Sequence, residues 1–180
     1  MGKGVSILLA CLSLTAQADE VGICYNYGCA VRARIEIDDS ALRSARQLLS
    51  RADDAAGERA AISRVIGLFE TVAGQQTPTW ADKGGNVNDD GVNGRMDCID
   101  ESTNATTYLR LLESHGWLRH HRVLEPVKRA PYWINVHWAA HIAEKQTGRE
   151  FAVDSWFFDN GRPAAIFRLD DWLDGAHPNE

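Results

Sequence analysis

Cys98 is the residue whose type and position best suit covalent chemistry. It follows a loop rich in Gly, Asn and Asp and opens the most helix-like segment in the second half of the chain, RMDCIDESTNA (95–105). At a helix start the backbone N–H groups lack partners and the helix dipole is positive, which favours a thiolate over a thiol. A thiolate attacks carbonyl carbon, so Cys98 is either a nucleophile or, as is commoner for cysteine, a small buried apolar residue.

A thiol nucleophile needs a base, and the base needs a third group that orients it. His137 and His141 are separated by an even number of residues in a strand-like segment, so they share a face. Asp154 lies in the next apolar run, VDSWFF (153–158), where a carboxylate needs a partner. A hairpin turning about Thr147-Gly148 places His141 opposite Asp154, whereas a longer loop or a bulge brings His137 there instead.

The order of these residues resembles the transglutaminase-like branch of the papain-like cysteine hydrolases, and the bacterial transglutaminase-like cysteine proteinases in particular. The similar segments are MDC (96–98), HWAAHI (137–142) and VD (153–154), and the resemblance covers roughly residues 98–158. The resemblance implies a thiol hydrolase or acyltransferase that acts on amide bonds, with Cys98 as nucleophile and Asp154 as orienting acid. It also implies that His137 is the base, and His141 is kept as the alternative base.

An oxyanion site for such a reaction needs hydrogen-bond donors beside the nucleophile. The sequence offers the backbone N–H of Cys98 and an amide from the loop 86–93. Trp138 and Trp156 can wall a cleft, although large aromatic residues on strands more often belong to the core.

The first 18 residues have the features of a secretory signal peptide. Lys3 gives a positive start, residues 5–14 form a short apolar run, and Ala16-Gln17-Ala18 is a suitable cleavage site. The apolar run is too short to span a bilayer as a mature helix. We therefore expect a single domain over residues 19–180, periplasmic or secreted, with no stable membrane span in the mature chain.

Export affects how the cysteines pair. Without Cys11 the mature chain keeps three, and Cys24 and Cys29 are close enough in sequence to form a local disulfide in an oxidising compartment. That pairing leaves Cys98 free, which favours a functional thiol. A disulfide from Cys98 to Cys24 or Cys29 remains open from sequence alone.

Hydrophobic periodicity and turn residues predict an α+β domain. The helical N-terminal half is expected to pack with a core helix bearing Cys98 against an antiparallel β-meander, the papain/transglutaminase-like arrangement. The expected segments are strands at 31–37, 117–124, 132–143, 150–158 and 164–168, helices at 41–49, 53–72 and 98–114, a connector between Pro126 and Pro131, and a closing helical turn at 169–175.

Charge and ligand spacing restrict the partners. A net charge of −6 with interspersed signs argues against nucleic acid. For an exported enzyme that acts on amide bonds, the expected partner is a peptide, protein or peptidoglycan-peptide substrate. His115 and the pair His120-His121 are more often surface residues than ligands, and a zinc site would require further Cys or His at fixed spacing. We expect neither a metal site nor a cofactor.

Two other functions remain open. The loop from Asn86 to Asp97 resembles the start of a calcium loop, with a Gly at its sixth position. The main alternative function is a non-catalytic envelope binding module of the same fold that buries Cys98, and calcium binding through this loop is an option within that alternative. A redox protein using Cys24 and Cys29 is a weaker alternative, because their spacing is not C-x-x-C.

Overall fold

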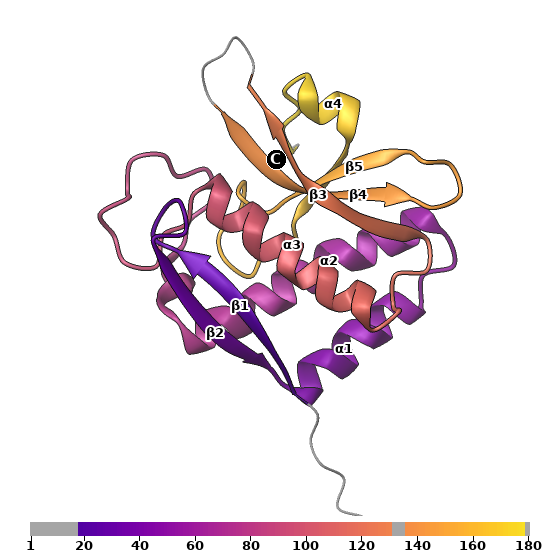
Figure 1. Cartoon of the computed structure of the whole chain (residues 1–180), viewed down its shortest axis with the longest axis horizontal. Coiled ribbons are helices and arrows are strands. Elements are labelled where there is room, and N and C mark those ends of the chain that lie inside the picture. Colours follow the sequence, from indigo (N-terminus) through magenta and orange to yellow (C-terminus); the bar gives the residue numbers. More distant parts are fainter. Residues whose placement is uncertain (1–17, 131–135, 179–180) are drawn as a thin grey trace, which may run out of the picture.

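The computed structural model describes residues 18–130 and 136–178. These residues form four α-helices, one short 3₁₀ helix and two antiparallel sheets, which confirms the mixed α and β class (Figure 1). The elements in chain order are β1 (Asp19–Tyr25), β2 (Val31–Ile37), α1 (Asp39–Ser50), α2 (Ala55–Gln76), η1 (Pro78–Ala81), α3 (Cys98–Ser114), β3 (His121–Arg129), β4 (His137–Glu144), β5 (Glu150–Asp154), β6 (Ala165–Arg168) and α4 (Leu169–Leu173).

Helix α3 is the central element. It lies between the β1–β2 hairpin and the four-stranded sheet, with α2 beside it (Figure 1). It begins at Cys98, as expected, because the Asp97 side chain caps it and accepts hydrogen bonds from the N–H groups of Ile99 and Asp100. Gly116, at φ 69°, follows its C-terminal end in the left-handed conformation that glycine adopts readily.

The N-terminal helices begin where their capping residues predict. Asp38 caps α1 and Asp54 caps α2 through side-chain hydrogen bonds to backbone N–H groups. The expected end of α2 at residue 72 is wrong, since the helix continues through Gly74 to Gln76. Gly74 is needed for close packing instead, because a Cβ there would lie 2.8 Å from the side-chain amide of Asn160.

The four-stranded sheet is a meander in the order β3-β4-β5-β6. The connector expected from Pro126 onward is wrong: β3 runs through Pro126, with a register shift between Leu124 and Val127. Proline is tolerated here because β3 is an edge strand and the pairing is irregular at that point. Strand β5 stops at Asp154 rather than at 158. The expected strand 132–143 is observed from His137, and residues 132–135 lie outside the described part.

The N-terminal hairpin was only half expected. β2 matches the alternating segment 31–37, whereas β1 was not predicted, since Gly22 and a cysteine interrupt its apolar pattern. The two strands pair antiparallel, and Ile23, Ile35 and Ile37 turn into the main core beneath α3. The hairpin is therefore an integral part of the domain.

The main core joins the helices to the sheet. Phe69 of α2 packs edge-on against Tyr108 of α3, with ring centroids 5.6 Å apart, and Ile142 of β4 is fully buried in the same cluster. His121 was expected at the surface and is instead fully buried, with Nδ1 2.8 Å from Glu58 Oε2. Among the described helices, none is long and apolar enough to cross a membrane.

Gly67 tests how tightly α2 packs on the segment that follows β5. A Cβ at Gly67 would lie 2.7 Å from the backbone oxygen of Arg162, so Gly67→Ala should lower the free energy of unfolding by about 1–3 kcal/mol, as overpacking does. Alanine is the better helix former, and an exposed site would give the opposite sign. Gly22→Ala, whose Cβ meets nothing within 4 Å, is the control. Urea unfolding measures both, and equal stabilities would contradict this packing.

Candidate active site

Cys98, His137 and Asp154 converge from three elements. Cys98 is the first residue of α3, His137 the first of β4 and Asp154 the last of β5. His137 Nε2 lies 2.7 Å from Asp154 Oδ2. Cys98 is free, partly exposed and lies with its Sγ 3.9 Å from the backbone oxygen of Val136. Cys98 and His137 line one cavity of about 530 Å³.

The strand register explains why His137 reaches Asp154. His141 pairs with Ala152, so the hairpin does not turn about Thr147-Gly148, and the register that would place His141 opposite Asp154 does not form. The turn is centred one residue earlier, as Glu144 N donates to Arg149 O, and this moves the pairing by two residues. Continuing the register puts Asp154 diagonal to His137 on the same face, within reach of a long side chain.

His141 has a different environment. Its Nδ1 lies 3.3 Å from the backbone oxygen of Glu125, and its Nε2 lies 3.2 Å from Glu150 Oε2. It is not among the described residues that line the cavity. The geometry therefore favours His137 over His141 as the partner of Cys98.

Asp154 is the buried acceptor of the site, only 1% exposed. Its Oδ2 accepts hydrogen bonds from His137 and from Trp172 Nε1, at 2.7 and 2.8 Å. Trp172 lies on α4 and is fully buried. Sequence reasoning missed Trp172, and the available signal was an indole in the closing helical turn, since a buried indole N–H needs an acceptor.

The environment of His137 favours its charged form. Burial lowers its pKa, but hydrogen bonding and charge interactions with Asp154 and with Cys98 outweigh burial and raise the pKa to about 9. The imidazole is therefore protonated at neutral pH, and its charge stabilises a thiolate beside it. Because Nε2 is held by Asp154, Nδ1 is the nitrogen available to Cys98. The rings of Trp156, Phe157 and Trp172, with centroids within 5.8 Å, enclose the imidazole.

The expected oxyanion donors differ in availability. The backbone N–H of Cys98 has no acceptor among the residues that the structure describes. The side chain of Asp97 accepts from the next two N–H groups of α3 instead. Asn86 lines the cavity, but its amide nitrogen donates to Asp82 and Asp89. The Cys98 N–H is thus the better of the two candidates. Trp156 also lines the cavity, whereas Trp138 is not among the lining residues.

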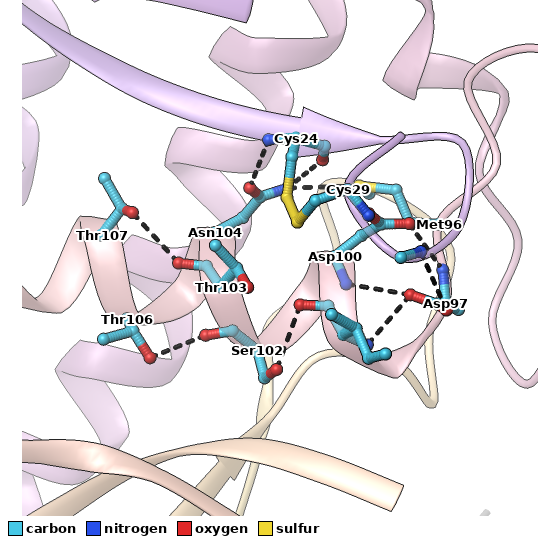
Figure 2. The surroundings of a disulfide bond; sticks show 12 residues. Cys24, Cys29, Met96, Asp97, Asp100, Ser102, Thr103, Asn104, Thr106 and Thr107 are labelled. Carbon is cyan, nitrogen blue, oxygen red and sulfur yellow. Dashed lines mark hydrogen bonds between the residues drawn. A yellow bond between two sulfur atoms is a disulfide. The ribbon is translucent and has the colours of Figure 1, made fainter. Parts of the chain in front are cut away.

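The turn between β1 and β2 fixes the start of α3. Figure 2 shows the Cys24–Cys29 disulfide, which confirms the predicted pairing, beside Asp97 and Asp100 of the capping box. The N–H of Gly28 donates to Asp97 Oδ2 at 3.0 Å, and that of Cys29 donates to Asp100 Oδ1 at 2.6 Å. Because these bonds join the turn to the cap, the disulfide-closed turn supports the position of Cys98.

Asn104 extends this support along α3. Its side-chain amide accepts from the backbone N–H of Cys24 and donates to the backbone oxygen of the same residue, both at 2.8 Å (Figure 2). The amide therefore pairs with β1 as a neighbouring strand would. Sequence reasoning found no role for Asn104, and a buried amide on a core helix was the only signal.

Sequence reasoning also missed a buried acidic cluster, which consists of Glu70, Asp82 and Glu101. Glu101, one turn after Cys98, accepts a hydrogen bond from the hydroxyl of Ser155, which follows Asp154. Burial raises the pKa of Glu101 well above its ordinary value, and the nearby charges of Glu70 and Asp82 raise it further. The cluster thereby ties the helix of the thiol to the strand of the orienting acid.

The residues of the expected calcium loop are engaged with protein groups. Asp89 accepts from the hydroxyl of Tyr27 at 2.5 Å and pairs with Arg95 at 2.8 Å, while Asp97 caps α3. Within the described ranges, one acid, His and Cys group has metal-ligand spacing, and it consists of Asp100 with the two disulfide cysteines. The calcium site stays a prediction without support from this geometry.

No protein-family model, curated protein or solved structure matches this chain. The resemblance to the transglutaminase-like hydrolases therefore rests on the short sequence motifs alone.

The acidic cluster predicts an unusual dependence of stability on pH. Burial raises the pKa of Glu70 to about 8 and that of Asp82 to about 6. The folded chain thus holds these protons more tightly than the unfolded chain, so stability is greatest below their ordinary pKa values and falls as pH rises through 6 to 8. We expect the melting temperature to fall between pH 5 and pH 9 by on the order of 5 °C or more.

Two variants check the origin of this effect by thermal unfolding at several pH values. Glu70→Gln removes one titrating group and should flatten the decline. Asp159→Asn is the control, because the ion pair with Lys83 lowers the pKa of Asp159 and its titration lies below this range. A Glu70→Gln curve parallel to that of the unchanged protein would contradict the assignment.

Proposed function

We propose that the protein is a thiol hydrolase or acyltransferase that acts on amide bonds through Cys98, His137 and Asp154. The observation that carries the proposal is the 2.7 Å bond between His137 and a buried Asp154, in a cavity that also contains a free cysteine at a capped helix start. A nucleophile, a base and an orienting acid in this relation form a triad of the thiol-enzyme type.

The geometry suits acyl transfer in two stages. The Cys98 thiolate attacks the carbonyl carbon of an amide, and the Cys98 N–H stabilises the negative oxygen that forms. His137 then gives its proton to the leaving amine, and a thioester remains on Cys98. In the second stage His137 takes a proton from water or from an amine, which attacks the thioester and frees the thiol.

The partner and location of this activity follow from the same proposal. Disulfides persist in oxidising compartments, so the Cys24–Cys29 bond supports an exported protein, periplasmic or secreted. An exported enzyme of this kind would meet peptides, proteins or peptidoglycan peptides. A cavity of about 530 Å³ accommodates a small part of such a chain.

The reactivity of Cys98 tests the proposal. Iodoacetamide should label Cys98 rapidly in the native protein at pH 6, because the proposed mechanism places the charge of the protonated His137 beside the sulfur. An ordinary thiol is only about 0.3% ionised at that pH, so His137→Ala should slow labelling by on the order of 100-fold. Rates are measured by mass spectrometry. Above pH 9, where His137 loses its proton, the two proteins should react at similar rates.

His141→Ala is the matched control and should label as fast as the unchanged protein, since His141 does not line the cavity. Asp154→Asn should slow labelling at pH 6 less than His137→Ala does. Labelling of Cys98 only after unfolding would sink the catalytic proposal and would favour the binding module.

A further inference from the structure

Arg129 is a second functional candidate in the cavity of Cys98. It is the last residue of β3, lines the same cavity and is only 8% exposed. Its Nη1 donates to the backbone oxygens of Trp172 and Ala176, at 2.6 and 3.3 Å. Its guanidinium carbon lies 4.8 Å from the centre of the Trp172 ring. These contacts fix the guanidinium in place against α4.

The charge of Arg129 has no anionic partner in the described part of the chain. No carboxylate there lies within ion-pair distance. The charge of Asp154 acts on Arg129 from farther away, and its Oδ2 accepts hydrogen bonds from His137 and Trp172. Arginine remains charged even when buried, and buried charges are normally paired. A guanidinium that is nine-tenths buried and has no ion-pair partner among the described residues favours an anion that binds from the cavity.

The remaining donors of Arg129 have the form that a carboxylate needs. Nε and Nη2 have no acceptor among the described residues, whereas Nη1 is bound to α4. Two guanidinium N–H groups side by side match the two oxygens of a carboxylate. If Arg129 only held α4 in place, this second edge of the guanidinium would have no function.

The other charged groups of the cavity agree with an anionic ligand. His137 is protonated at neutral pH and lines the same cavity. The carboxylate of Asp97, which also lines it, accepts from N–H groups of α3 and from Gly28. The lining thus presents two cationic side chains, while its one acidic side chain is engaged with backbone donors.

We infer that Arg129 binds a carboxylate of the substrate, so that the amide bond attacked by Cys98 lies next to a free carboxylate in the peptide. The carboxylate is either the C-terminal group of the peptide or an acidic side chain. This inference rests on the proposed function, and it adds a substrate class and a specificity residue.

Two alkylating reagents of the same reactive centre test the inference. With iodoacetate or iodoacetamide the thiolate sulfur forms a bond to the methylene carbon and iodide leaves, so the reagents differ only in carboxylate against amide. The measured quantity is the rate of Cys98 labelling by iodoacetate divided by the rate of labelling by iodoacetamide. This ratio in the native protein, divided by the same ratio in the unfolded protein, measures how strongly the cavity attracts a carboxylate. We expect this relative ratio to be about 10-fold or more for the native protein, since 1.4 kcal/mol of attraction corresponds to tenfold.

Arg129→Gln should lower the ratio several-fold toward the unfolded value, while labelling by iodoacetamide stays fast. His137 is present in both proteins, so the difference isolates Arg129. Lys128→Gln is the matched control, because Lys128 is the adjacent cation on β3, lies over Trp138 and does not line the cavity. A ratio that is unchanged in Arg129→Gln, or equal in native and unfolded protein, overturns the carboxylate site and leaves the proposed function standing.

A protection measurement on the unchanged chain avoids any loss of folding in Arg129→Gln. N-acetylalanine offers a terminal carboxylate, N-acetylaspartic acid α-amide offers a side-chain carboxylate, and N-acetylalanine amide offers neither. Slower labelling of Cys98 by iodoacetamide with one of the first two, and none with the third, supports the site and identifies the source. Equal effects of all three contradict it. A Cys98 that reacts with neither reagent overturns the proposed function and the inference with it.

Discussion

The candidate site depends on the hydrogen bonds that the buried carboxylate of Asp154 accepts. An isolated charge in this position would be costly, and its stabilisation requires donors from other parts of the chain. His137 supplies one from the neighbouring strand, and Trp172 supplies the other from the C-terminal helix. The backbone oxygen of Trp172 in turn accepts a hydrogen bond from Arg129, and the guanidinium of Arg129 lies over the Trp172 ring. One carboxylate therefore organises β4, β5, the end of β3 and α4.

Helix α3 needs a comparable restraint, because the thiol lies on its first residue. The turn between β1 and β2 binds the cap of α3 from one side through Asp97 and Asp100. The acidic cluster binds it from the other side through Glu101 and Ser155. The start of α3 is thus hydrogen-bonded to a disulfide-closed turn on one side and belongs to a buried acidic cluster on the other. Both restrain the position of Cys98 relative to His137.

Local chemistry made much of this predictable. The starts of α1, α2 and α3 follow from short side chains that bond to their own backbone, and Cys24 and Cys29 pair because they are near in sequence and leave Cys98 free. The strand register was less accessible, since moving the turn centre by one residue exchanges the histidine that meets Asp154. Trp172, Asn104 and Glu101 were missed for another reason: their partners lie 18, 80 and 54 residues away in the chain, and no local pattern encodes such contacts.

The turn between β1 and β2 joins a strained backbone to the start of α3. Residues 26–29 all have positive φ, which is unfavourable for residues other than glycine, and a covalent bond closes the turn at Cys24 and Cys29. The disulfide therefore restrains the backbone that carries the N–H groups of Gly28 and Cys29, and these N–H groups hydrogen-bond the cap of α3. The covalent bond between one pair of cysteines thus acts, through the helix cap, on the segment that carries the third cysteine.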